Sequence, residues 1–284
     1  MDLGSITGPI VGSVAELIDL RDTWKPPGSQ APLQRLAFRG QPREFGTLVP
    51  SFQRQFSRQS HGAASLIEGR LVSAFREHYA ALKDRSHDMP DPRQIAEGYD
   101  LRCLSVMQHY EIPTRLLDWT SDYWTAVYFA CASEPGSTAE LWYYDRQLFD
   151  AQRASDPSLQ TLVVPGLDPQ REPPILYKRG ENLIVELDPQ LTPRMLQQFG
   201  HHTVSTNAFA DHAPLIADLH RSLATTADQG VGLRRILIES SCKSNALQFL
   251  AQEMKITAST IFPDVVGLGR FLRWQFDSLR TMYM

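Results

Sequence analysis

The chain has 284 residues, 42% of them hydrophobic and 21% charged, a balance typical of soluble globular proteins that excludes collagen-like, coiled-coil and largely disordered chains. Its formal net charge of −4 offers no overall basic surface for nucleic acid. Three widely spaced cysteines fit neither a disulfide framework nor a zinc cluster, which favours a reducing compartment. Because no run approaches about 20 consecutive apolar residues, we expect a cytoplasmic protein without a membrane partner.

Hydrophobic spacing and chain breakers predict helices that alternate with strands. Ser13 is expected to be the N-cap of the first helix, with Glu16 completing a capping box. Helices are expected at 13–24, 65–82, 93–109, 121–132, 211–224, 244–254 and 265–279, with one helical turn at 193–199. Strands are expected at 36–39, 112–117, 140–144, 182–187 and 235–239, with a short extended segment at 261–263.

This alternation, without runs of hairpins, indicates an α+β fold with a small central split sheet flanked by helices. Residues 1–32 form a helix and linker that belong to the same domain as 33–284, because no change in composition marks a boundary. Five prolines and little periodicity between 151 and 179 predict a surface insertion.

The segment 108–120, QHYEIPTRLLDWT, is the most informative part of the chain. A helix end, a proline, a strand and a helix start are expected within it, and such a junction places polar groups at a sheet edge where ligands bind. Thr120 or Ser121 is expected to cap the next helix. From these residues alone, Arg115 and Asp118 could form a structural ion pair or belong to a ligand site.

Together with Phe38-Arg39-Gly40-Gln41, the segment 108–120 resembles the FRG-domain family, named for its Phe-Arg-Gly motif. The resemblance extends over about 13–275 and implies a fold more than an activity. Glu111 stands where the family usually has glycine, and His202 where an aromatic residue is more usual. Other matching positions are 48–52, Arg54, Glu68, Phe75, 126–130, Arg194, Gln198, Gly200 and 261–264.

A more distant similarity is to ADP-ribosyltransferases, and it implies NAD as the substrate. The strand that ends in Arg39 and Gly40 looks like their first conserved strand, and 118–121 looks like their second motif. Arg39 would then hold the pyrophosphate, Gly40 would let the backbone approach the ligand, and Asp118 and Thr120 would order the ribose. Further residues expected to bind the cofactor are Gln41, Thr114, Arg115, Trp119 and Ser121, and Phe129 could stack on a base.

The same similarity implies a carboxylate or amide beside the ribose, because the transition state resembles an oxocarbenium ion. ADP-ribosyltransferases supply a glutamate from a later strand, for which Glu186 and Glu239 are candidates. The family-like C-terminal motif instead places Gln198 there. His109 is a candidate general base, since histidine titrates near neutral pH.

Three functions follow from these expectations. The first is an enzyme that transfers ADP-ribose from NAD to a macromolecule, either protein or nucleic acid, or to water, as a toxin or antiphage effector would. The second is a non-catalytic nucleotide-binding or interaction module, favoured by the glutamine at 198. The third is a nuclease-like effector. His201, His202, His212 and His220 lack metal-ligand spacing, and we expect no metal site.

Overall fold

A computed structural model describes residues 6–24, 35–55, 61–82, 100–156, 159, 182–187, 193–223, 232–263 and 265–283. None of the helices within these ranges combines the length and the hydropathy that crossing a membrane requires. The three cysteines are buried and form no disulfide.

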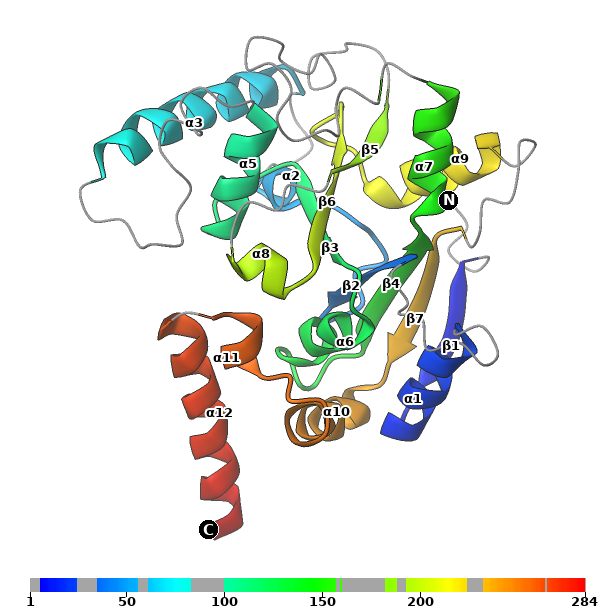
Figure 1. The fold of residues 1–284 in the computed structure, drawn as a ribbon, viewed down its shortest axis with the longest axis vertical. Coiled ribbons are helices and arrows are strands. Elements are labelled where there is room, and N and C mark those ends of the chain that lie inside the picture. Colours follow the sequence, from blue (N-terminus) through cyan, green and yellow to red (C-terminus); the bar gives the residue numbers. More distant parts are fainter. Residues whose placement is uncertain are drawn as a thin grey trace.

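Within the described ranges, one seven-stranded sheet is flanked by helices (Figure 1). Its strands are β1 (Thr7–Val11), β2 (Leu36–Gln41), β3 (Leu116–Thr120), β4 (Ala139–Asp145), β5 (Ile184–Leu187), β6 (Gly200–Ser205) and β7 (Arg234–Ile238). They lie in the order β1-β7-β4-β2-β3-β6-β5. β1 and β7 are parallel, and all other neighbours are antiparallel. The α+β class is confirmed, but the sheet is larger than the small one expected.

The helices of the described residues are α1 (Val14–Thr23), α2 (Ser51–Arg54), α3 (His61–Ala81), α5 (Asp100–His109), α6 (Tyr123–Cys131), α7 (Gln147–Ser155), α8 (Pro193–Gln197), α9 (His212–Leu223), α10 (Ser240–Gln252), α11 (Ala258–Ile261) and α12 (Val265–Tyr283). Strands β1 and β6 and helices α2, α7 and α11 were not expected. The beginning of the helix expected at 93–109 and most of the insertion expected at 151–179 lie outside the described residues.

Two groups of helices cover one face of the sheet. α1, α6 and α10 pack on β2, β4 and β7 around Phe38 and Ile236, and α3 and α5 pack on β3, β5 and β6 around Leu116 and Val204. α7 and α9 cover the opposite face, around Trp142. The boundary between the first two groups lies over the junction of β2 with β3, where each strand contributes to a different core cluster.

β2 and β3 meet over a very short length. Their register contains one pair, Phe38 with Thr120, whereas β2 pairs with β4 over six residues and β3 pairs with β6 over five. Beyond that pair, the Arg39 side chain connects the strands, because its Nη1 donates a hydrogen bond to the backbone oxygen of Asp118 over 2.7 Å. Backbone polar groups of β2 and β3 beyond this single pair are therefore not engaged in pairing between these two strands.

Gly40 lets helix α6 lie directly against β2. A Cβ atom at this position would lie 2.0 Å from the backbone oxygen of Ala126 and 2.5 Å from the backbone nitrogen of Ala130. The two small helix residues are four positions apart and so share one helix face. Gly40 thus makes room for helix α6, and its expected approach to a ligand stays a prediction.

A Schellman motif ends helix α5. The Glu111 N–H donates to Gln108 O and the Ile112 N–H donates to Met107 O, each over 3.0 Å. Glu111 takes the left-handed conformation that this motif requires, with φ 61°, and Met107 and Ile112 belong to one apolar cluster. The position therefore suits the glycine that the family usually has, and the glutamate keeps the same turn.

Because of this turn, β3 begins later than expected. Residues 112–115 form a loop and the strand occupies 116–120, so Asp118-Trp119-Thr120 forms the end of the strand. Two residues separate it from the start of α6 at Tyr123, which confirms the expected strand-to-helix junction. The N-cap of α6 is Asp122, whose Oδ2 accepts a hydrogen bond from Thr125 N over 2.7 Å. The expectation that Thr120 or Ser121 would cap this helix is wrong.

Ser13 caps α1, as expected. Its Oγ accepts a hydrogen bond from Glu16 N over 3.3 Å. The Glu16 carboxylate accepts from Gly12 N over 2.8 Å, one residue before the donor of a standard capping box.

A buried lysine of α10 joins the loop after β2 to the loop after α6. Lys243 is 1% exposed. Its Nζ donates to the backbone oxygens of Pro42, Ser133 and Glu134 over 2.7–2.8 Å and lies 3.4 Å from that of Ser137. These carbonyls solvate the ammonium in place of water and hold both loops beside the Gly40 contact.

Candidate functional site

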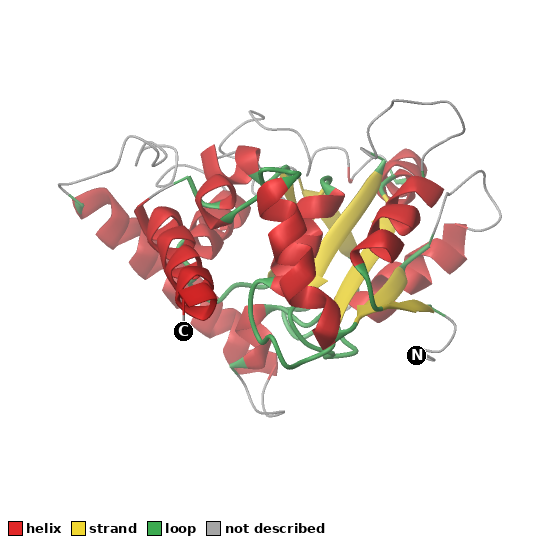
Figure 2. Ribbon diagram, turned by 90° about the horizontal axis from the view of Figure 1, so that it is seen from below, coloured by secondary structure: helices red, strands yellow, loops and turns green. Residues whose placement is uncertain are grey.

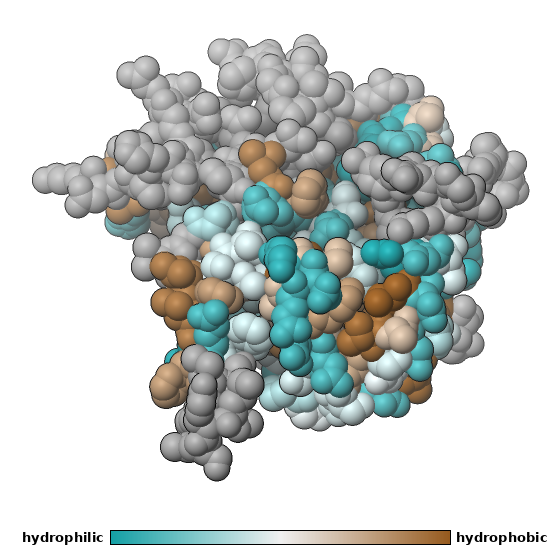
Figure 3. Space-filling model, turned by 60° about the horizontal axis from the view of Figure 1, so that its bottom comes forward, coloured by the Kyte–Doolittle hydropathy of each residue, from teal (hydrophilic) through white to brown (hydrophobic). Residues whose placement is uncertain are grey.

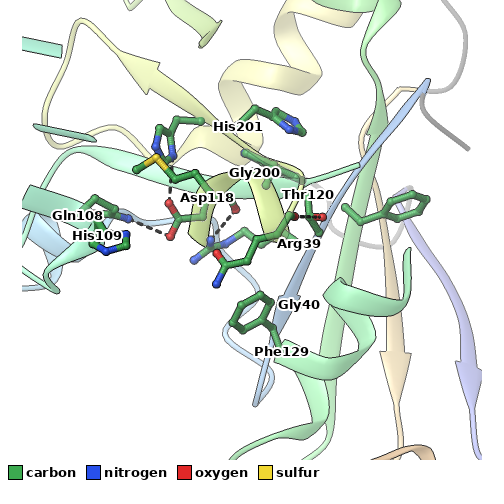
Figure 4. A pocket seen from close by; sticks show the side chains of 14 residues that line it. Arg39, Gly40, Gln108, His109, Asp118, Thr120, Phe129, Gly200 and His201 are labelled. Atoms are coloured by element: carbon green, nitrogen blue, oxygen red, sulfur yellow. Dashed lines mark hydrogen bonds and ion pairs between the residues drawn. The ribbon is translucent and has the colours of Figure 1, made fainter. Parts of the chain in front are cut away.

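A pocket of about 230 Å³ lies where β2 and β3 separate (Figure 4). Sheet residues form its floor, α5 and α6 its two sides, and α8 a further wall. The expected site residues that line it are Arg39, Gly40, His109, Asp118, Trp119, Thr120 and Gln198. The other lining residues are Phe38, Gln108, Phe129, Met195, Gly200, His201 and His202.

Asp118 is the centre of the pocket's polar network. Its Oδ1 lies 3.0 Å from His202 Nδ1, and its Oδ2 accepts a hydrogen bond from Gln108 Nε2 over 3.1 Å. Figure 4 shows Gln108 and Arg39 approaching this residue from different sides. The Asp118 side chain is nonetheless 55% exposed. It is thus held in one orientation while remaining open to a ligand.

Asp118 is also ionised over the whole physiological range. Removal of surrounding water acts to raise the pKa of Asp118, but the hydrogen bond and charge of His202, then Arg39 and Gln108, outweigh this effect and lower the pKa to about 2. Such a group accepts a proton poorly but keeps its negative charge at the pocket surface.

His202 is fixed from behind by a serine. Ser105 Oγ lies 2.9 Å from His202 Nε2, so serine, histidine and aspartate follow one another as in a hydrolase triad. The exposure is reversed, however, because Ser105 is 1% exposed and the carboxylate faces the pocket. Ser105 is therefore not placed to attack a substrate, and the three residues serve to position Asp118.

Gln108 is fixed in the same way by Thr114. The Thr114 hydroxyl donates to Gln108 Oε1 over 2.5 Å, and Thr114 itself is fully buried. The expectation that Thr114 contacts a cofactor is wrong, since it acts through Gln108.

Arg39 brings an incompletely satisfied guanidinium to the pocket. One nitrogen bonds the Asp118 backbone, whereas the buried Nε has no hydrogen-bond partner among the described residues. Burial lowers the pKa of Arg39 and the charge of Asp118 acts against this, but arginine remains charged in proteins. An oxyanion ligand would satisfy the free donor.

The side chains of Thr120 and Gln198 form hydrogen bonds within the protein. The Thr120 hydroxyl donates to Gln198 O over 2.6 Å and accepts from Asp122 N over 3.0 Å. The Gln198 side chain donates to Ile261 O in α11 over 3.1 Å. Both residues join α8 to its neighbours at the pocket wall, which does not fit the catalytic roles expected of them.

Trp119 faces away from the pocket. Strand alternation directs its ring to the opposite sheet face, where Nε1 donates to Thr203 Oγ1 over 2.9 Å and the ring packs against Tyr144. It cannot stack on a ligand in the pocket. Phe129, on α6, lines the pocket and keeps the stacking role considered for it.

Arg115 is part of a buried ion pair, but not with Asp118. Its guanidinium binds both carboxylate oxygens of Glu68 in α3 and donates to the backbone oxygens of Ser205 and Thr206. The pair fastens α3 to β3 and β6 and does not reach the pocket, so the cofactor-binding expectation for Arg115 is wrong.

The two candidate glutamates also lie elsewhere. Glu186 accepts from Tyr144 OH over 2.8 Å and is held by Arg146. Burial raises the pKa of Glu186, and its Oε1 lies 3.3 Å from His201 Nε2, behind the pocket wall. Glu239 is the N-cap of α10, beyond β7, which β4 separates from β2.

The remaining expected residues are near the pocket without lining it. Gln41 is 5% exposed and donates to Thr47 O over 3.0 Å. Ser121 lines a separate cavity of about 160 Å³.

Six lining residues were given no role in the site by sequence reasoning: Phe38, Gln108, Met195, Gly200, His201 and His202. Burial lowers the pKa of His201 well below its usual value, so its imidazole is neutral. Within the described ranges, no group of three or more histidine, cysteine, aspartate or glutamate residues is arranged to hold a metal ion.

Comparison with known proteins identifies one region. Residues 34–138 match the FRG domain, a range that includes β2, α5, β3 and α6 and covers less than half of the chain. Arg39, Gln108 and Asp118 lie inside this range, whereas His202 lies outside it. No curated protein and no solved structure matches the chain.

Proposed function

Starting from an FRG domain over residues 34–138, we propose that this chain is an enzyme that cleaves the bond between nicotinamide and ribose in NAD. It transfers the ADP-ribosyl group to a macromolecule or to water. The observation that carries the proposal is Asp118, an exposed, ionised carboxylate held by His202 and Gln108 beside the Arg39 guanidinium.

A permanently charged carboxylate suits this bond cleavage. As the carbon–nitrogen bond breaks, its electron pair leaves with nicotinamide, and positive charge develops at the ribose carbon. Asp118 stabilises that charge without reorganising, because its neighbours already fix it. An acceptor oxygen then bonds to the same carbon and loses its proton, which His109 at the pocket wall takes.

The other parts of NAD meet matching groups. Arg39 holds the pyrophosphate through its guanidinium, whose Nε has no hydrogen-bond partner among the described residues, and Phe129 stacks on the nicotinamide ring. The catalytic carboxylate in this proposal comes from β3, in place of the later-strand glutamates Glu186 and Glu239 expected from the sequence, since neither of these lines the pocket.

The test uses the whole chain and NAD labelled separately in its two halves. Wild-type protein should bind NAD in calorimetry, release nicotinamide, and pass the ADP-ribosyl label to water or to a component of a cell lysate. Asp118→Asn should keep most of the binding but lose about 10²–10³-fold in nicotinamide release, the range for removal of one preorganised electrostatic group. Asp218→Asn, an exposed carboxylate of α9, is the matched control and should change neither. Absence of NAD binding by the wild type, or full activity in Asp118→Asn, would contradict the proposal.

One observation favours the second candidate, a non-catalytic nucleotide-binding module. The described lining of the pocket contains no glutamate, and ADP-ribosyl transfer was expected to use one. A binding module would bind NAD in the same calorimetry, lose that binding in Arg39→Ala, and release no nicotinamide in any form of the protein.

A further inference from the structure

A second and larger cavity adjoins the candidate pocket beneath helix α12. Its volume is about 690 Å³, and its lining comes from α6, α10, α11 and α12 (Figure 1). In Figure 1, α12 extends away from the rest of the molecule towards the C-terminus, and in Figure 2 it is seen nearly end-on beside the C label. The two cavities share one lining residue, Phe129, so they lie next to each other across this side chain.

The lining of this cavity suits a ligand that carries both an aromatic ring and a negative charge. The rings of Phe271 and Trp274 are stacked with centroids 6.2 Å apart, and Arg270 lies 4.8 Å from the Phe262 ring centroid. Arg273 also lines the cavity. The one carboxylate in the described lining, Glu111, lies 3.6 Å from Arg270. Aromatic faces beside two arginines can stack on a base and bind phosphate at the same time.

The volumes of the two cavities support a ligand that occupies both of them. Sites for drug-sized molecules measure about 300–1,000 Å³, and the candidate pocket, at about 230 Å³, is below that range. The candidate pocket is therefore small for a whole dinucleotide, and we assign it to the nicotinamide end. The neighbouring cavity is large enough for the remainder.

We infer that the cavity beneath α12 binds the adenosine end of NAD, while the candidate pocket binds the nicotinamide end. The pyrophosphate then passes Phe129, with Arg39 on one side and the arginines of α12 on the other. This inference rests on the proposed function, and it makes the dinucleotide, rather than a mononucleotide, the substrate.

The opposite face of α12 provides matched controls. Leu268, Leu272 and Phe276 are 47%, 52% and 63% exposed and do not line the cavity. Figure 3 shows hydrophobic atoms along the margin of the molecule where α12 lies. An aromatic residue can therefore be removed from either face of the same helix.

The experiment compares nicotinamide release from NAD and from nicotinamide mononucleotide, which lacks the adenosine end. The wild type should have a kcat/KM at least tenfold higher for NAD. Trp274→Ala should lower kcat/KM for NAD at least tenfold, mainly through KM, and change the value for the mononucleotide less than twofold. Phe276→Ala should change neither. Arg273→Ala, at an exposed position, should raise KM for NAD alone, and it tests the same contact if Trp274→Ala does not fold.

The outcomes separate this inference from the proposed function. Equal kcat/KM for the two substrates in the wild type overturns the inference and leaves the proposed function standing. So does an equal loss on both substrates, or no loss, in Trp274→Ala and Arg273→Ala. Release of nicotinamide from neither substrate by the wild type refutes both.

Discussion

The contact between Gly40 and helix α6 makes a quantitative prediction about stability. In Gly40→Ala the new methyl group would lie 2.0 Å from a backbone oxygen and 2.5 Å from a backbone nitrogen of α6, whereas ordinary contacts begin at 3.4 Å. The obstacle is helix backbone, which cannot rotate away as a side chain can. β2 and α6 must therefore separate by more than an ångström, in the middle of the cluster around Phe38 and Tyr123.

Overpacking of a well-packed core costs about 1–3 kcal/mol and occasionally more, and a clash with backbone belongs at the upper end. We expect Gly40→Ala to lose at least about 3 kcal/mol of unfolding free energy, or about 6–12 °C in Tm for a domain of this size. Urea denaturation followed by circular dichroism measures the first quantity, and thermal denaturation measures the second.

The control is Gly69→Ala in helix α3, where an added Cβ meets no atom within 4 Å. This change should raise stability by about 0.5–1 kcal/mol, because alanine favours a helix over glycine. If Gly40→Ala were as stable as the wild type, the close approach of α6 to β2 would not explain why glycine follows Arg39 in this chain.

Three further predictions concern single residues. Glu111→Gly should raise the unfolding free energy by about 0.5–1 kcal/mol in urea denaturation, since glycine adopts the left-handed conformation without strain, and Glu111→Ala should show no such gain. His202→Gln should raise the pKa of Asp118 from about 2 towards its ordinary value, and an NMR titration of the carboxyl carbon that gave an unchanged pKa would contradict the network described above. Burial, with the nearby arginine charges, lowers the pKa of His212 to about 3, so protons bind this residue in the unfolded chain before they bind it in the folded one. Stability should therefore fall as pH decreases below about 6.5, by about 2 kcal/mol at pH 5, and His212→Asn should remove that part of the loss in denaturation curves at pH 7.5 and pH 5.

The sequence predicted which residue types form the site better than it predicted their orientation. Arg39 and Asp118 lie in the two most distinctive motifs, and both line the pocket. Trp119 lies in β3 and Glu186 in β5, but both side chains face the side of the sheet opposite to the pocket. A side chain's face depends on strand register, and a shift of one residue reverses it. Here β3 begins at Leu116 because of the preceding turn, which composition alone does not reveal.

His202 could not be assigned from the sequence for a related reason. It lies opposite Asp118 only because β3 and β6 pair antiparallel in one register, and the two residues are far apart in the chain. The one available signal was that a histidine stands where the family usually has an aromatic residue. Gly40 was recognised as a place of close approach, but nothing local indicates that the approaching group is a helix.

The surroundings of Lys243 explain why this position holds a lysine and not an arginine. Only five of its 28 basic residues are lysines, and this one is enclosed by backbone oxygens from two loops. Those oxygens converge on a single point, which suits a compact ammonium, whereas a guanidinium spreads its donors over a rigid planar fork. The cage of backbone oxygens therefore suits lysine better than arginine, although both side chains carry one positive charge. This explains why a chain rich in arginine has a lysine at position 243.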